Sequence, residues 1–164
     1  MLTVLKRQEA IKLASFVQMF SLSPKEREVK IEDAFAEFGI ADVSEAEANV
    51  YLRKYFKIEM SLVTNSYLQE VLSEQLSITV KIVGKEPSLH RCYCCGYKTL
   101  EERGGYDICE VCYWEDTGNH DDEKYSSPNH MTLNEGKRNY REFGASKERY
   151  LKFLDKKRFR KYDK

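Results

Sequence analysis

The spacing of apolar and polar residues predicts helices at the start of the chain. Residues 1–20 carry apolar side chains at roughly helical intervals, with four charged residues among them. That pattern is typical of one face of a soluble helix. A second helix is predicted after Ser23 and Pro24, because serine is a good N-cap and proline is favoured at the first helical position. Gly39 is suited to end it.

Two more helices and a strand follow in the pattern. Ser44 and Glu47 form a capping box, which predicts a third helix to about residue 55, and Asn65 is placed to cap a fourth. Residues 77–84, SITVKIVG, alternate and are rich in β-branched side chains. We therefore expect a strand there.

The end of the chain has helical signals as well. Thr132 and Glu135 form another capping box, and Gly144 is suited to end the helix that they open. Residues 146–162 are amphipathic and predict a last helix.

These elements predict an α+β protein with three parts. Residues 1–76 form a helical N-terminal region, residues 77–146 a strand plus a small zinc-ribbon-like β-hairpin domain with four cysteine ligands, and residues 147–164 a basic C-terminal helix. The 164 residues, two-fifths of them apolar, are enough for one domain or two small units.

Charge is balanced overall but unevenly distributed. The formal net charge is zero, yet residues 147–164 hold nine Lys or Arg against three Asp or Glu, while residues 91–146 hold seven against eleven. The first twenty residues are too charged for a secretory or membrane-spanning segment, so we expect a cytoplasmic protein. Thiols stay reduced in that compartment, which favours metal binding over disulfides.

All five cysteines lie within residues 92–112, CYCCGYKTLEERGGYDICEVC. Four of them form two C-x2-C pairs, and two such turns place four thiolates in the tetrahedron that Zn2+ prefers. A hairpin across residues 99–108, turning at Gly104-Gly105, is expected to join the pairs. The predicted zinc ligands are Cys92, Cys95, Cys109 and Cys112.

Isolated buried thiols and a redox motif account for the cysteines less well. Unrelated buried thiols would not fall in pairs, and a redox C-x-x-C motif sits between a strand and a helix, which this segment lacks. Cys94 is expected to be a small buried side chain and not a fifth ligand. His90, two residues before Cys92, is an alternative zinc ligand. Four cysteines fill the zinc shell, and the deaminase pattern H-x-E is absent, so we expect no enzyme.

Basic residues near the cysteines have two interpretations. Arg91, Lys98 and Arg103 either balance the negative charge of a Zn–thiolate cluster or are simply solvated.

An acidic loop follows the second cysteine pair. Carboxylates steer basic partners and an exposed tryptophan anchors interfaces, so this loop is a candidate protein-binding surface. Alternatively, the tryptophan covers the zinc site and the acids cap a turn. The candidate residues are Trp114, Glu115, Asp116, Asp121 and Asp122.

The basic C-terminal segment supports an alternative function. Residues 156–161 interleave basic and aromatic side chains, which suits contacts to nucleic-acid phosphates. A solvated helix end, with cations placed favourably for the helix dipole, explains the same pattern.

The segment from Cys92 to Ala145 resembles the bacterial cysteine-rich CPCC family. The matching runs are CYCCGYKTL, ERGGYDICEVCYWED and LNEGKRNYREFGA, with Tyr93 in place of the proline in the family name. The resemblance implies a zinc-ribbon-like domain and, for some members, an immunity role in which the protein binds and neutralises a toxin. We therefore expect a non-catalytic zinc-binding module that binds a protein partner, with nucleic-acid binding as the alternative.

Overall fold

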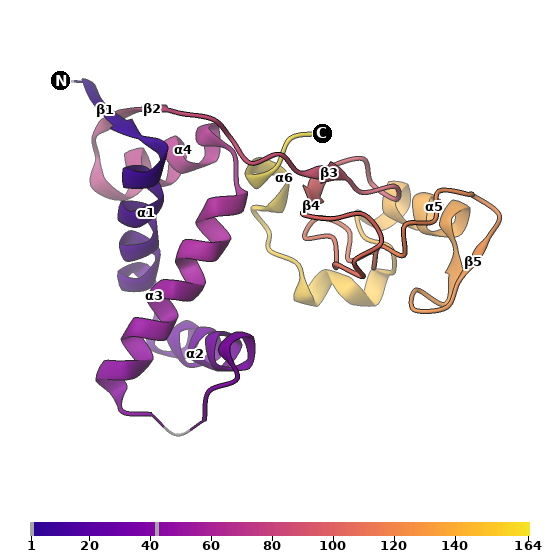
Figure 1. The fold of residues 1–164 in the computed structure, drawn as a ribbon, viewed down its shortest axis with the longest axis horizontal. Coiled ribbons are helices and arrows are strands. Elements are labelled where there is room, and N and C mark those ends of the chain that lie inside the picture. Colours follow the sequence, from indigo (N-terminus) through magenta and orange to yellow (C-terminus); the bar gives the residue numbers. More distant parts are fainter. Residues whose placement is uncertain (1, 42) are drawn as a thin grey trace. The chain divides into compact units, whose positions relative to one another are not determined.

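The computed structural model describes residues 2–41 and 43–164, and it divides into two units, Met1–Pro87 and Ser88–Lys164 (Figure 1). The predicted α+β class is confirmed, because a mainly helical first unit is followed by small hairpins, a four-cysteine cluster and short helices. The observed division at residue 87 differs from the boundaries expected at residues 76 and 146.

The described residues of the N-terminal unit form four helices and a pair of parallel strands. Its elements are β1 (Leu2–Lys6), α1 (Arg7–Ser21), α2 (Pro24–Phe38), α3 (Glu45–Leu62), α4 (Asn65–Leu76) and β2 (Thr79–Val83). The prediction that the first helix begins at the start of the chain is wrong, since residues 2–6 form β1 and pair with β2 from Leu2↔Thr79 to Lys6↔Val83. This pairing also explains why β2 belongs to the first unit.

The predicted helix ends are largely confirmed. Ser23 and Ser44 accept hydrogen bonds from the N3 amides of α2 and α3, and Gly39 closes α2 with φ 61°. α3 continues beyond the predicted end, to Leu62. The N-cap of α4 is Thr64, one residue before the predicted Asn65, because the Thr64 hydroxyl accepts from the amide of Tyr67.

The core of this unit lies where α1, the end of α3, α4 and β2 meet. The predicted face of the first helix is partly wrong, since Phe16 is 39% and Phe20 78% exposed and the buried side chains of α1 are mostly smaller ones. The main apolar cluster comprises Ala10, Ile11, Ala14, Met60, Val63, Tyr67, Leu68, Val71, Leu72, Val80 and Ile82.

The C-terminal unit is built from short elements. They are β3 (His90–Arg91), β4 (Lys98–Leu100), β5 (Tyr125–Ser126), β6 (Met131–Thr132), α5 (Leu133–Phe143), the 3-10 helix η1 (Glu148–Phe153) and α6 (Arg158–Lys161). The capping box at Thr132 and the glycine C-cap at Gly144 are as predicted.

The hairpins lie elsewhere than expected. β3 pairs with β4 around the first cysteine pair, and Ile108 bridges Glu115 around the second, so each pair sits in its own turn. Residues 101–105 form bends between them. The single hairpin predicted across residues 99–108 is therefore wrong in position.

The last predicted helix is also broken. η1 ends at Phe153, Leu154 is extended, and α6 spans only four residues. The reason is tertiary: Arg158 is buried and donates to the carbonyls of Val111, Asp155 and Gly144. The segment follows these contacts instead of continuing a helix.

Candidate metal centre

Four sulfur atoms meet at one point in the C-terminal unit. The Sγ atoms of Cys92, Cys95, Cys109 and Cys112 all lie within 4.8 Å of one another, and all four residues are buried. The Cys92–Cys112 and Cys95–Cys109 sulfurs are each 3.6 Å apart. Zn–S bonds of about 2.3 Å in a tetrahedron place sulfurs ~3.8 Å apart. The cluster thus has metal-binding geometry.

Backbone hydrogen bonds shape the two turns that carry these sulfurs. In the first turn, the Gly96 amide donates to the Cys92 carbonyl at 2.8 Å, and Gly96 has φ 84°, which favours glycine. In the second, the Tyr113 amide donates to the Cys109 carbonyl at 2.8 Å, and Tyr113 itself has φ 63°. The two turns are equivalent knuckles, and we call them the first and second knuckle.

The crowded thiols perturb one another. Burial raises the pKa of Cys112. The pKa of Cys92 is raised too, and the largest cause is the hydrogen bond between Cys92 and Cys109. Burial opposes ionisation of Cys109 as well, yet hydrogen bonds with the other thiols hold its pKa well below the ordinary value. A bound cation would favour the thiolate form of all four cysteines, because opposite charge stabilises the ionised group.

Two polar side chains interact with the cluster. The Thr99 hydroxyl donates to the Cys109 sulfur at 3.1 Å, and hydrogen bonds of this kind orient metal ligands. Burial, followed by the negative charge of Cys95, raises the pKa of the Tyr140 phenol. Thr99 was not singled out in the sequence, because it does not lie next to a cysteine.

The family comparison agrees with this geometry. Residues 90–160 match the model of the family described as cysteine-rich CPCC. This match lies within the C-terminal unit, and we call that unit the CPCC domain. The match extends beyond the predicted segment, Cys92 to Ala145, and includes η1 and most of α6. Comparison with curated proteins found no match, and neither did comparison with solved structures.

Trp114 is a core residue of the CPCC domain. It is 2% exposed, and a Cβ at Gly136 in α5 would lie 2.6 Å from its Cζ3. The same Cβ would be 3.4 Å from Cys94 Sγ, so Cys94 fills space under α5 and stands outside the four-sulfur cluster. Of the two interpretations of Trp114, the structure supports the packing one.

Asp116 is buried too, so its predicted exposure to a partner is wrong. Asp116 is 0% exposed. Its Oδ2 accepts a hydrogen bond from the Gly104 amide at 2.8 Å, and its Oδ1 lies 4.0 Å from Arg103 Nη1. Arg103 in turn covers the ring of Tyr93, with the guanidinium carbon 4.0 Å from the ring centroid. Asp116 thus holds the segment between the knuckles to the second knuckle.

The remaining acids of the candidate surface are accessible. Asp121 and Asp122 are exposed and Glu115 is half-buried. Asp122 pairs with Lys137 of α5 at 2.6 Å, and Asn129 exchanges two hydrogen bonds with the backbone of Glu115. The loop therefore has a defined backbone with carboxylates on its surface.

Two of the basic residues and the histidine predicted near the cluster make other contacts or are exposed. Arg91 is exposed and donates to the Gly96 carbonyl at 3.0 Å, and the Lys98 amide donates to the Asp163 carbonyl. His90 is exposed in β3 and stands outside the four-ligand set.

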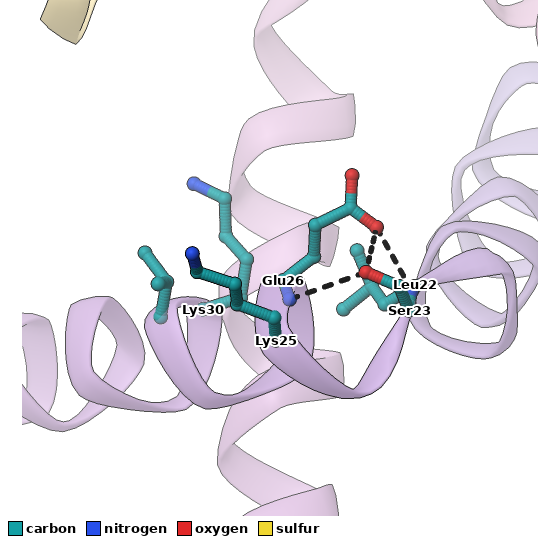
Figure 2. Close-up of a pocket in the computed structure, with 6 residues that line it drawn as sticks. Leu22, Ser23, Lys25, Glu26 and Lys30 are labelled. Carbon is teal, nitrogen blue, oxygen red and sulfur yellow. Dashed lines mark hydrogen bonds between the residues drawn. The ribbon is translucent and has the colours of Figure 1, made fainter.

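The N-terminal unit has a shallow pocket. It lies beside the first turn of α2, where Ser23 and Glu26 form the capping box shown in Figure 2. Lys30 lines it, but its amine is bound to Asp33 at 2.9 Å.

No helix in the described part of the chain is long and apolar enough to cross a membrane. Among the described residues, the side-chain group that could hold a metal lies in the CPCC domain.

Proposed function

We propose that this chain is a non-catalytic zinc-binding protein whose CPCC domain binds a protein partner. The observation that carries the proposal is the buried cluster of Cys92, Cys95, Cys109 and Cys112. Four thiolates occupy every position of a tetrahedral zinc ion, which is typical of a structural site, whereas catalytic zinc keeps one position for water.

The partner-binding surface that we propose is the acidic side of the domain. Residues 101–123 contain nine Asp or Glu and one Arg. Asp116 is buried and is left out of the surface. The exposed acids nearest the second knuckle are Asp121, Asp122 and Glu123. Such a surface attracts a basic partner and accelerates association.

An immunity role is the specific form of this proposal. The CPCC family match supports it by likeness, and an acidic surface suits a basic toxin such as a nuclease. The chain would then act in the cytoplasm by binding the toxin and covering its active surface.

The test uses a basic toxin encoded beside this gene, produced together with the full chain. We expect co-elution and loss of the toxin's activity. The triple charge reversal Asp121→Lys, Asp122→Lys and Glu123→Lys should slow association by about tenfold or more at low salt. Reversal of Glu28, Glu32 and Glu37, three exposed acids of α2, is the matched control. Equal association by both variants would contradict the acidic surface as the binding site.

A further inference from the structure

Three aromatic rings stack on the surface beside the second knuckle. Tyr113 belongs to the knuckle, and Tyr150 and Phe153 belong to η1. The Tyr113 ring centroid lies 4.5 Å from that of Tyr150, with 35° between the planes, and 5.6 Å from that of Phe153, with 28°. Phe153 is 59% exposed. Much of the Phe153 side chain is thus open to solvent, next to a preformed ring stack.

The metal-holding knuckle fixes the position of this stack. The Tyr113 amide donates to the Cys109 carbonyl at 2.8 Å, and the Tyr113 carbonyl accepts from the Ser146 hydroxyl at 3.2 Å. The Ser146 amide donates to the Cys112 carbonyl at 2.7 Å. These bonds join the start of η1 to two ligand residues, so the rings stand on a rigid base.

Three cations surround the same rings. Lys147 Nζ and the Arg149 guanidinium carbon lie 5.5 and 5.3 Å from the Tyr150 centroid, and Lys152 Nζ lies 4.7 Å from the Phe153 centroid. Glu148 is the acid within this segment. We call the three rings and three cations the aromatic–basic patch.

We propose that the aromatic–basic patch binds single-stranded nucleic acid. A nucleotide presents a flat base and a neighbouring phosphate together, and the patch presents rings and cations together. Aromatic stacking of successive bases and a positively charged surface along the backbone are the two features of sequence-tolerant single-strand binding. A duplex hides its base faces, so it would use the cations and leave the rings unused.

This site differs from the basic segment singled out in the sequence, residues 156–161. Arg158 is buried against backbone carbonyls, and Lys161 pairs with Asp155 at 2.6 Å. Those two side chains therefore support the fold. The stacked rings with their cations lie earlier, at residues 147–153, together with Tyr113 of the knuckle.

The experiment measures binding of a fluorescein-labelled single-stranded oligonucleotide of mixed sequence to the zinc-loaded full chain. The same strand annealed to its complement is the second probe. We expect tighter binding of the single strand. Phe153→Ala should weaken it by ~5- to 150-fold, the value of one base–aromatic stack. Phe20→Ala, another exposed phenylalanine, is the control in the N-terminal unit and should leave binding unchanged.

A second variant tests the cations. The double variant Arg149→Gln, Lys152→Gln should make the negative slope of log affinity against log salt shallower by about 1.4. Each phosphate contact to a single strand contributes ~0.7 to the steepness of that slope. Phe153→Ala and the double variant should both keep their zinc, because none of the three altered residues belongs to the four-cysteine cluster.

Three results would overturn the proposal. The first is an absence of oligonucleotide binding at low salt. The second is equal affinity of Phe153→Ala and the unaltered chain. The third is binding of labelled poly-glutamate that matches the single strand in affinity and in sensitivity to Phe153→Ala, which would make the patch a site for acidic peptides.

Discussion

The guanidinium carbon of Arg103 lies 4.0 Å from the centroid of the Tyr93 ring, and the same arginine faces the buried carboxylate of Asp116. His120 contacts Tyr93 as well, with the ring centroids 5.9 Å apart. Tyr93 stands where the family name has proline. In this chain the altered position of the first knuckle therefore holds a side-chain stack that reaches the acidic loop.

Tyr93→Pro should loosen that loop without removing the metal. The substitution deletes the contacts to Arg103 and His120, each worth about 0.5–1 kcal/mol, while proline stiffens the knuckle. We expect faster amide hydrogen exchange at residues 117–123 and unchanged zinc content. Tyr93→Phe keeps the ring and is the control. Unchanged exchange in the proline variant would show that the stack does not restrain the loop.

Arg103→Met should destabilise the domain through Asp116. The carboxylate would stay buried with one hydrogen bond, from the Gly104 amide, and no cation facing it. We expect a loss of about 1–3 kcal/mol in the free energy of unfolding, measured with denaturant. Arg91→Met removes an exposed arginine and should cost less. If Asp116→Asn does not reduce the loss in the Arg103→Met background, the unpaired carboxylate is not its cause.

Gly136→Ala should destabilise the domain although alanine favours helices. The added Cβ would lie 2.6 and 2.9 Å from two carbons of the Trp114 ring, which is itself buried. Overpacking of this kind costs about 1–3 kcal/mol, more than the ~1 kcal/mol that alanine gains over glycine in a helix. Thermal unfolding of the metal-loaded protein measures the difference.

Gly105→Ala is the matched control for that substitution. Gly105 lies outside the positive-φ region, and its added Cβ would meet atoms no closer than 3.5 Å. Its effect should stay within about 0.5 kcal/mol. Equal stability of the two variants would contradict the packing role of Gly136.

Metal removal should unfold the CPCC domain and spare the N-terminal unit. The four ligands come from two knuckles, and the N-terminal unit has its own apolar core. We expect a chelator to abolish the near-ultraviolet signal of Trp114 while most helical circular dichroism remains. Cys109→Ser should lower zinc content well below one per chain, and Cys94→Ala should retain one. Loss of zinc in Cys94→Ala would contradict the four-ligand assignment.

Local signals in the sequence predicted most of the helix ends and the four cysteines that cluster. A capping box such as Ser44 with Glu47 involves residues three apart, and a C-x2-C pair defines its own turn. These features form wherever the segment lies in the fold. The same reasoning explains the success at Thr132 and Gly144.

Three of the larger misses depend on residues distant in the chain. β1 forms because it pairs with β2, more than seventy residues later, and no local periodicity signals that partner. Asp116 reads as a surface acid until Gly104 and Arg103 are placed beside it. Arg158 reads as part of a basic tail until its Nε is seen to donate a hydrogen bond to the Val111 carbonyl.

The last residues of the sequence bear on how the protein should be handled. The Asp163 carbonyl accepts from the Lys98 amide at 2.8 Å, and the Lys164 side chain lies against the Gly96 position and over the ring of Tyr97. A polyhistidine tag joined after Lys164 would emerge beside the first knuckle and bring competing imidazoles to the four thiols. Metal stoichiometry should accordingly be measured on protein purified through an N-terminal, cleavable tag.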